Sequence, residues 1–303
     1  MASWARALRI GLAAVLIVLV WRLVDGADVV ARLQGVRPGW VAVAVALLIG
    51  QTLLSAIRWR LTAARLGQEM GFLHAVREYF LAQMVNLALP GGVVGDAGRA
   101  VRARGAVGLE RAGQAVLFER MAGQAALVAV TLVGALVVGL WPGGIDLPVA
   151  MQAMLGLVAV GLVAAGWAML RVGPRWPRVQ AWRRAAWQAL FARDVRGAQA
   201  MLSLGTVAAN LLAFAACAAA VGVILSPGAM LVILPLVLFT MLIPLTIGGW
   251  GLREGAAVVL FPLAGATGAE GFAASATFGI VLLLTSVLGM IVWLLPARAP
   301  ENA

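Results

Sequence analysis

Two arginines stand beside interruptions of apolar segments, where each could bind an anion. The stretch NLALPGGVVGDAGRA places Arg99 after a proline and several glycines, and MLIPLTIGGWGLREG places Arg253 at the same distance after a second proline. Proline removes a backbone donor and glycine permits a tight reversal, so each interruption frees N–H groups at the start of the next helix. Such a helix start attracts anions, and a guanidinium group adds a planar, bidentate phosphate donor. The spacing therefore predicts two hinges that present a phosphate site, with hinge positions Pro90, Gly91, Gly92, Gly95, Pro244, Gly248, Gly249 and Gly251.

Carboxylates accompany both arginines. Asp96 precedes Arg99 by one helical turn and forms a local pair with it, while Glu119 and its neighbour Arg120 point to different sides of one helix. Glu119 is therefore placed to meet Arg99 or Arg253 on another element. The predicted substrate-binding residues are Arg99, Arg253, Asp96, Glu119, Glu254 and Asn86. In the alternative interpretation the charges form structural ion pairs that hold the interrupted segments, and Asn86 satisfies a freed backbone carbonyl.

The composition places these residues in a membrane. Of 303 residues, 63% are hydrophobic and 12% are charged, against about 25% charged residues in an average soluble domain. We predict an all-α polytopic membrane protein, because only helices and closed barrels satisfy the backbone in lipid. Full spans are expected near 7–24, 40–57, 112–141, 149–170, 201–225 and 272–296, and the interrupted segments near 72–99 and 230–263.

The arginines predict the orientation. The net charge is +11, which in a soluble protein would suggest nucleic acid, but here membrane topology explains it. With both termini in the cytoplasm, the arginines after the second span (Arg58, Arg60 and Arg65) and those of segment 171–198 lie inside. The interrupted segments must then return to the side they enter from, as re-entrant hairpins. The segment 171–198 itself is expected to lie on the inner leaflet as an amphipathic helix.

The order of elements predicts an inverted repeat. Span, interrupted hairpin and span occur at about 40–141 and again at about 201–296, and the single span 149–170 between them turns the second half over. Paired broken helices in inverted halves are typical of transporters with a site near the bilayer midplane. The whole chain, 1–303, is expected to form one membrane domain.

Metal and cofactor chemistry is not expected. His74 is the only histidine and Cys217 the only cysteine, so a multi-histidine or multi-thiol metal site is excluded. No nucleotide-binding P-loop pattern occurs, so ATP-driven transport by this chain is not expected, and no catalytic residue is assigned.

Four motifs in order resemble the lysylphosphatidylglycerol synthase transmembrane family of flippase-like proteins. They are IRWRLTAARLG, NLALPGGVVGDAGRA, FERMAG and IPLTIGGWGLREGA. The resemblance implies a bacterial or archaeal cytoplasmic-membrane protein that moves a lipid between leaflets. In that family the cargo is aminoacylated phosphatidylglycerol or another lipid, and no aminoacyl-transfer domain follows residue 296 here.

The residues and the resemblance together predict a lipid translocase that holds a head-group phosphate with arginines at two broken helices. Membrane phospholipids, anionic ones above all, are the expected partners, and nucleic acid is not. A homo-oligomer and a separate lipid-synthesising enzyme stay open as partners. Two alternatives also stay open: a membrane-embedded transferase with Asp96 and Glu119 as acid and base, and a secondary transporter of a small solute or ion.

Overall fold

The computed structural model describes residues 26–89, 92–105, 107–140, 145–172, 176–243 and 245–294, with seven isolated positions before residue 26. All regular elements in these ranges are helices. Five of them are long and apolar enough to cross a membrane, by length and composition. The predicted all-α membrane fold is therefore confirmed. Most of the first predicted span, 7–24, lies outside the described residues.

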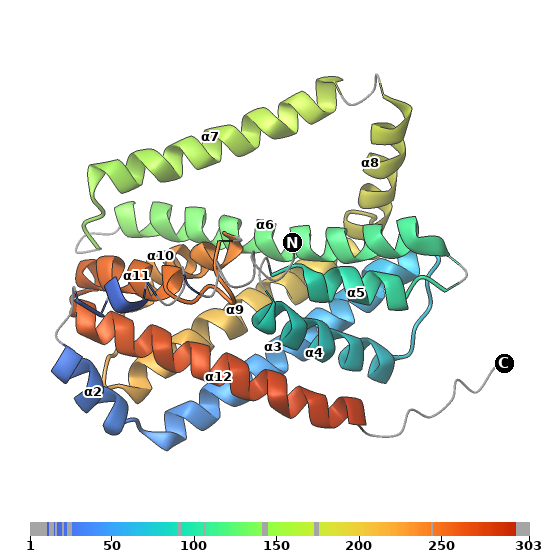
Figure 1. Ribbon diagram of the computed structural model, residues 1–303. Helices are drawn as coiled ribbons and strands as arrows, with labels where there is room; N and C mark the ends of the chain where they lie inside the picture. The colour runs from blue at the N-terminus through green and yellow to red at the C-terminus, as the bar shows by residue number, and fades with distance from the viewer. Residues whose placement is uncertain are drawn as a thin grey trace.

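The five long helices correspond to the other predicted spans. They are α3 (Pro38–Arg65), α6 (Gly108–Leu140), α7 (Val149–Val172), α9 (Arg196–Ala220) and α12 (Gly268–Leu294). Figure 1 shows α3, α6, α9 and α12 lying roughly along one direction, with α7 set apart from them. At about 1.5 Å per residue, α3 and α6 exceed the roughly 30 Å of a bilayer core, so their ends project beyond it.

Both interrupted segments are helical hairpins. In the first, α4 (Phe72–Ala88) is followed by a non-helical stretch and by the short α5 (Val94–Arg102). In the second, α10 (Pro227–Phe239) continues into the 3-10 turn η2 (Thr240–Leu242), and a loop then leads to α11 (Leu252–Leu260) and η3 (Phe261–Ala264). The arms of each hairpin pack against each other. Pro90, Gly91 and Pro244 lie outside the described residues.

Several predicted hinge glycines do have the backbone that glycine alone adopts readily. Gly92, Gly248, Gly249 and Gly251 have φ values of 61°, 59°, 78° and 85°. Gly95 is different because it lies inside α5. A Cβ atom there would collide with the carbonyl group of Ala82, so this glycine is needed for the close approach of α5 to α4 rather than for a turn.

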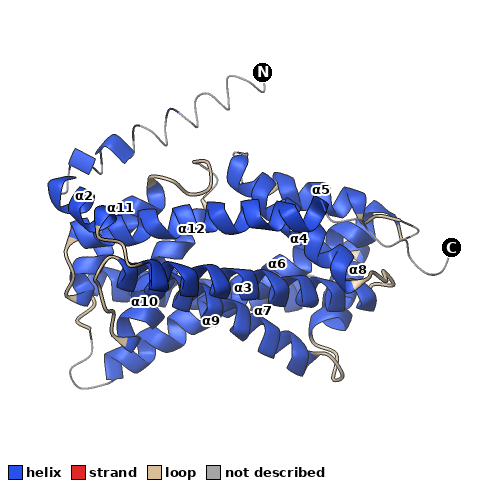
Figure 2. Cartoon of the chain, turned by 90° about the horizontal axis from the view of Figure 1, so that it is seen from below, coloured by secondary structure: helices blue, strands red, loops and turns tan. Residues whose placement is uncertain are grey.

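The two hairpins enter the bundle from opposite ends. In Figure 1, α4 and α5 occupy the end that carries α8 (Pro177–Leu190), and α10 and α11 occupy the end that carries α2 (Gly26–Gln34). Figure 2 shows the same separation from below. The long helices of the second half run opposite to their counterparts in the first, as the predicted inverted repeat requires. The repeat and domain boundaries themselves stay a prediction.

Candidate functional site

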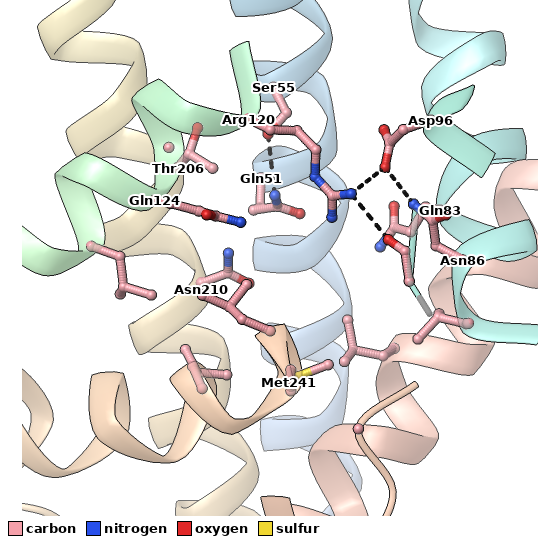
Figure 3. Close-up of a pocket in the computed structure, with 18 of the residues that line it drawn as sticks. Gln51, Ser55, Gln83, Asn86, Asp96, Arg120, Gln124, Thr206, Asn210 and Met241 are labelled. Carbon is pink, nitrogen blue, oxygen red and sulfur yellow. Dashed lines mark hydrogen bonds and ion pairs between the residues drawn. The ribbon is translucent and has the colours of Figure 1, made fainter. Parts of the chain in front are cut away.

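A cavity of about 320 Å³ lies where the two hairpin interruptions meet (Figure 3). Asn86 and Gly92 line it from the first interruption, and Met241, Gly248 and Gly249 line it from the second. Faces of α3, α6, α9 and α12 complete the wall. Two segments that are far apart in the chain therefore share one internal space.

Glu119 is the centre of a buried charge cluster beside this cavity. Its carboxylate accepts from the Arg58 guanidinium at 2.7 Å and from Arg99 Nη2 at 3.1 Å. The hydroxyl of Tyr79 donates to the same carboxylate at 3.1 Å. The sequence prediction that Glu119 meets Arg99 is confirmed, and Arg58 is a second partner that it did not include.

Asp96 connects the cluster to the first interruption. Its two oxygens accept from Arg99 at 2.8 Å and from Arg120 Nη1 at 2.6 Å, which confirms the predicted local pair with Arg99. The Asn86 amide donates to Asp96 at 2.7 Å, and its oxygen accepts from the backbone N–H of Gly95 at 2.8 Å. Asn86 thus satisfies a freed N–H at the start of α5, whereas the sequence alternative assigned it to a freed carbonyl.

Arg99 is enclosed by aromatic rings as well as by carboxylates. Its guanidinium carbon lies 4.5 Å from the Trp59 ring centroid and 4.4 Å from that of Tyr79. The side chain is fully buried. Cation–π contacts of this kind stabilise a desolvated guanidinium, so Arg99 holds α3, α4, α5 and α6 together.

Arg253 has a comparable but separate enclosure. Its Nη2 pairs with Glu254 at 2.6 Å and its Nε donates to Ser275 at 2.9 Å. Glu254 also accepts from the N–H of Gly251 at 2.6 Å, which caps α11. A Cβ atom at Gly279 would collide with the Arg253 guanidinium, so that glycine makes room for it.

The structure thus divides the six predicted binding residues into two groups. Asp96, Glu119 and Asn86 line the cavity. Arg99, Arg253 and Glu254 lie behind the wall and are fully buried. In this arrangement their contacts favour the structural alternative. Nε and Nη1 of Arg99 have no hydrogen-bond partner among the described residues, but both arginines are fully buried, so direct phosphate contact by either one requires a movement of the cavity wall.

Two arginines that the sequence prediction did not include do reach the cavity. Arg58 was counted among the cytoplasmic arginines after the second span, but it lies within α3 and is 3% exposed. Arg120 lines the cavity with a side chain that is 33% exposed. Its Nη1 donates to Asp96 and to the carbonyl of Gly92, while its Nε and Nη2 have no hydrogen-bond partner among the described residues.

Uncharged polar side chains surround these ions. Carboxamides reach the cavity from α3, α4, α6 and α9, namely Gln51, Gln83, Asn86, Gln124 and Asn210. The sequence analysis did not include Gln51, Gln83, Gln124 and Asn210, although helical spacing could have indicated two of them. Gln51, Ser55 and Arg58 share one face of α3, and Thr206 and Asn210 share one face of α9. A polar face on an otherwise apolar span marks a wall of a site.

Apolar side chains also line the cavity, namely Leu127, Leu238, Met241, Ile243 and Leu282. The cavity therefore presents hydrocarbon as well as charges and amides. Across the described ranges, no group of three or more His, Cys, Asp or Glu residues could hold a metal ion.

A family model described as the lysylphosphatidylglycerol synthase TM region matches residues 6–289. A search of curated proteins finds no match.

Proposed function

The chain belongs to the lysylphosphatidylglycerol synthase TM region family, and we propose that it moves a phosphate-bearing lipid between membrane leaflets. The family places it in a membrane and relates it to lipids. The lipid-moving activity rests on the geometry of the cavity.

The charge balance of the buried cluster carries this proposal. Three guanidinium groups, from Arg58, Arg99 and Arg120, face two carboxylates, from Asp96 and Glu119. One formal positive charge is left over in a site enclosed by apolar helices. The leftover charge belongs to Arg120, whose side chain is 33% exposed in the cavity, so an anion with one negative charge that displaces water there would balance the cluster. A phosphodiester is such an anion.

The mixed polar and apolar lining of the cavity fits an amphiphile. Its volume of about 320 Å³ is at the lower end of the roughly 300–1,000 Å³ typical of small-molecule sites. It holds a head group and not a whole lipid. The head group would lie at Arg120, and the acyl chains would continue past the apolar side chains toward the bilayer.

Arg120 is the residue assigned to the phosphate. It has free N–H groups, reaches the cavity and is held at one end by Asp96. Arg99 and Arg253 orient the hairpins in this proposal, and they contact the phosphate only in states where the cavity wall has moved to expose them. The carboxylates Asp96 and Glu119 are committed to guanidinium groups rather than to a substrate hydroxyl, which argues against the transferase alternative.

The test is a leaflet-exchange assay in proteoliposomes, with phosphatidylglycerol labelled on an acyl chain and a membrane-impermeant quencher. Arg120→Gln is expected to slow exchange by about ten- to a hundredfold, the equivalent of one charge-assisted hydrogen bond. Arg60→Gln, which alters an exposed arginine outside the cavity, is the control. Wild-type vesicles that exchange lipid no faster than protein-free vesicles would reject the translocase, and equal rates for the two variants would reject the role of Arg120.

A further inference from the structure

Helix α8, outside the cavity, has two different faces. Ala185 and Ala189 are buried, and α8 packs against α3 and α6. Arg184 and Trp187 project away from this buried side, because successive residues of a helix are about 100° apart. Trp187 is 64% exposed and packs on the ring of Phe191, which is 54% exposed, with the two centroids 5.3 Å apart. The outer face of α8 therefore exposes aromatic rings together with arginine.

The arginines of α8 have no carboxylate partners. Arg178, Arg183 and Arg184 lie in this helix, which contains no acidic residue. None of the three has an ion-pair partner among the residues that the structure describes, whereas Arg65 at the same end of the molecule pairs with Asp194 at 2.8 Å. Each guanidinium group offers a planar fork of N–H donors that matches a phosphate. A phosphate-bearing ligand would therefore complement the charge of this helix.

The position of α8 identifies a membrane surface as the source of that phosphate. The preceding helix, α7, is long and apolar enough to cross a membrane and is mostly exposed, and α8 begins a few residues after it ends. Figure 1 shows α8 lying across the direction of the long helices. Tryptophan rings favour the boundary between head groups and acyl chains, and arginines there attract anionic lipids. An acidic soluble protein would match the arginines but would leave the exposed rings unexplained.

The inner side of α8 contacts the helices that hold the buried charge cluster. Trp182 packs edge-to-face on Phe118, the residue before Glu119 in α6, with ring centroids 6.1 Å apart. On the other side, the Nε2 group of Gln199 donates to Thr62 of α3 at 2.9 Å and to the carbonyl of Ala189 in α8 at 3.0 Å. The docking of α8 is therefore linked to the packing of α3 against α6.

We propose that the outer face of α8 is a binding site for anionic phospholipid, separate from the cavity, and that lipid bound there stabilises α8 on α3 and α6. Arg183 and Arg184 bind the lipid phosphate, and Trp187 and Phe191 lie at the level where the acyl chains begin. A ligand that binds only the folded state raises its stability. The lipid at α8 is a bound ligand and not cargo, so this site does not depend on the translocase function.

The first experiment measures which lipid lies beside α8. The full chain with Cys217→Ala carries a bimane fluorophore on Gln188→Cys, at an exposed position of α8. It is placed in nanodiscs of phosphatidylcholine and phosphatidylglycerol in equal amounts, with one or the other lipid brominated to quench the fluorophore. The composition stays the same, so a difference in quenching reports enrichment. Phosphatidylglycerol is expected to show about a fivefold higher relative association constant, the equivalent of one arginine contact.

The controls separate α8 from the rest of the surface. Bimane on Val160→Cys, 66% exposed in the middle of α7, is expected to be quenched equally by the two lipids. Arg184→Gln is expected to reduce the preference at Gln188→Cys, whereas Arg60→Gln, which removes an exposed charge of α3 at the same end, is expected to retain it. Equal quenching by both lipids at Gln188→Cys would overturn the anionic site, and quenching by neither would show that α8 does not lie on the membrane.

The second experiment measures stabilisation by the bound lipid. Thermal unfolding is compared in nanodiscs of phosphatidylcholine alone and of the equal mixture with phosphatidylglycerol. The mixture is expected to raise the unfolding temperature by about 2 °C for each arginine contact. This increase is expected to persist in Arg120→Gln, which alters the cavity, and to shrink in Arg184→Gln. An increase that disappears in Arg120→Gln and remains in Arg184→Gln would assign the stabilisation to the cavity and overturn the role of α8.

Discussion

Glu119 joins three parts of the bundle because its carboxylate accepts from guanidinium groups on two other helices. Arg58 lies on α3 and Arg99 on α5, and both are almost completely buried, as is Glu119 itself. An ion in such surroundings is tolerated only when it is paired and hydrogen-bonded. Glu119 is therefore needed to keep the two arginines paired, even though the ion pairs as a whole add little to the net free energy of folding.

The first residue-scale prediction follows from this pairing. Glu119→Gln keeps the shape of the side chain but leaves the buried Arg58 guanidinium without its carboxylate and leaves Arg99 with Asp96 alone. The free energy of unfolding is expected to fall by about 3–5 kcal/mol. Thermal unfolding in detergent measures the loss. Glu110→Gln, on the exposed start of the same helix, is the control and is expected to change stability by about 0.5 kcal/mol or less. Similar unfolding temperatures for the two variants would contradict the cluster.

Sequence reasoning found part of this cluster because part of it is local. Asp96 and Arg99 are one turn apart, and the adjacent Glu119 and Arg120 must diverge on a helix. The sequence analysis did not place Arg58 in this cluster, because it assigned arginines near the end of a span to a cytoplasmic loop. The partner of Arg58, Glu119, is also 61 positions away in the chain. Only the packing of α3 against α6 brings them together. The local sequence of neither helix therefore identifies the other residue as the partner.

At the scale of elements, the two hairpins differ in how they are held. The first is fixed by ions that reach from α5 to α3 and α6. In the second, the ion pair of Arg253 with Glu254 is local to α11, where Glu254 also caps the helix at Gly251, and the contact with another helix is made by the uncharged Ser275 of α12. The proline and glycine pattern predicted both interruptions, because those residues act locally on the backbone. It could not predict this difference, which depends on side-chain partners on other helices.

The element-scale prediction concerns the contact of α5 with α4. Gly95→Ala would place a Cβ atom against the Ala82 carbonyl, so α5 must shift and Asp96 must move with it. Overpacking of this kind is expected to lower the free energy of unfolding by about 1–3 kcal/mol, and phosphatidylglycerol exchange is expected to slow as well. Thermal unfolding and the proteoliposome assay measure the two effects.

Gly98→Ala is the matched control in the same short helix. Its Cβ atom would meet only the flexible end of the Arg102 side chain. Because alanine favours helix over glycine by about 1 kcal/mol, this variant is expected to unfold at or above the wild-type temperature. If Gly95→Ala behaves as Gly98→Ala does, the close approach of α5 to α4 is refuted.

The whole molecule has a strong charge asymmetry between its two ends. The end that carries α8 holds most of the exposed arginines, including Arg60, Arg65, Arg104, Arg178, Arg184 and Arg193. The opposite end holds Arg32 and Arg37, and Arg32 is paired with Asp28 and Glu270 at 3.0 Å each. Figure 1 shows α8 lying across the direction of the long helices, as an interfacial helix would. Since cytoplasmic loops collect arginine, this end is the one predicted to face the cytoplasm.

That orientation gives the prediction for the molecule as a whole, in a protein whose Cys217 has been replaced by alanine. A cysteine at Arg104, beyond α5, should react with an impermeant maleimide only from the cytoplasmic side. A cysteine at Ile224, which is 89% exposed in the turn after α9, should react only from the outer side. The wild-type chain, whose single cysteine is buried, sets the background. The two positions must differ in sidedness because the hairpins enter from opposite ends of the bundle. Labelling of both from one side would mean that the two hairpins enter from the same face, and a cavity between opposed hairpins could not then alternate between leaflets.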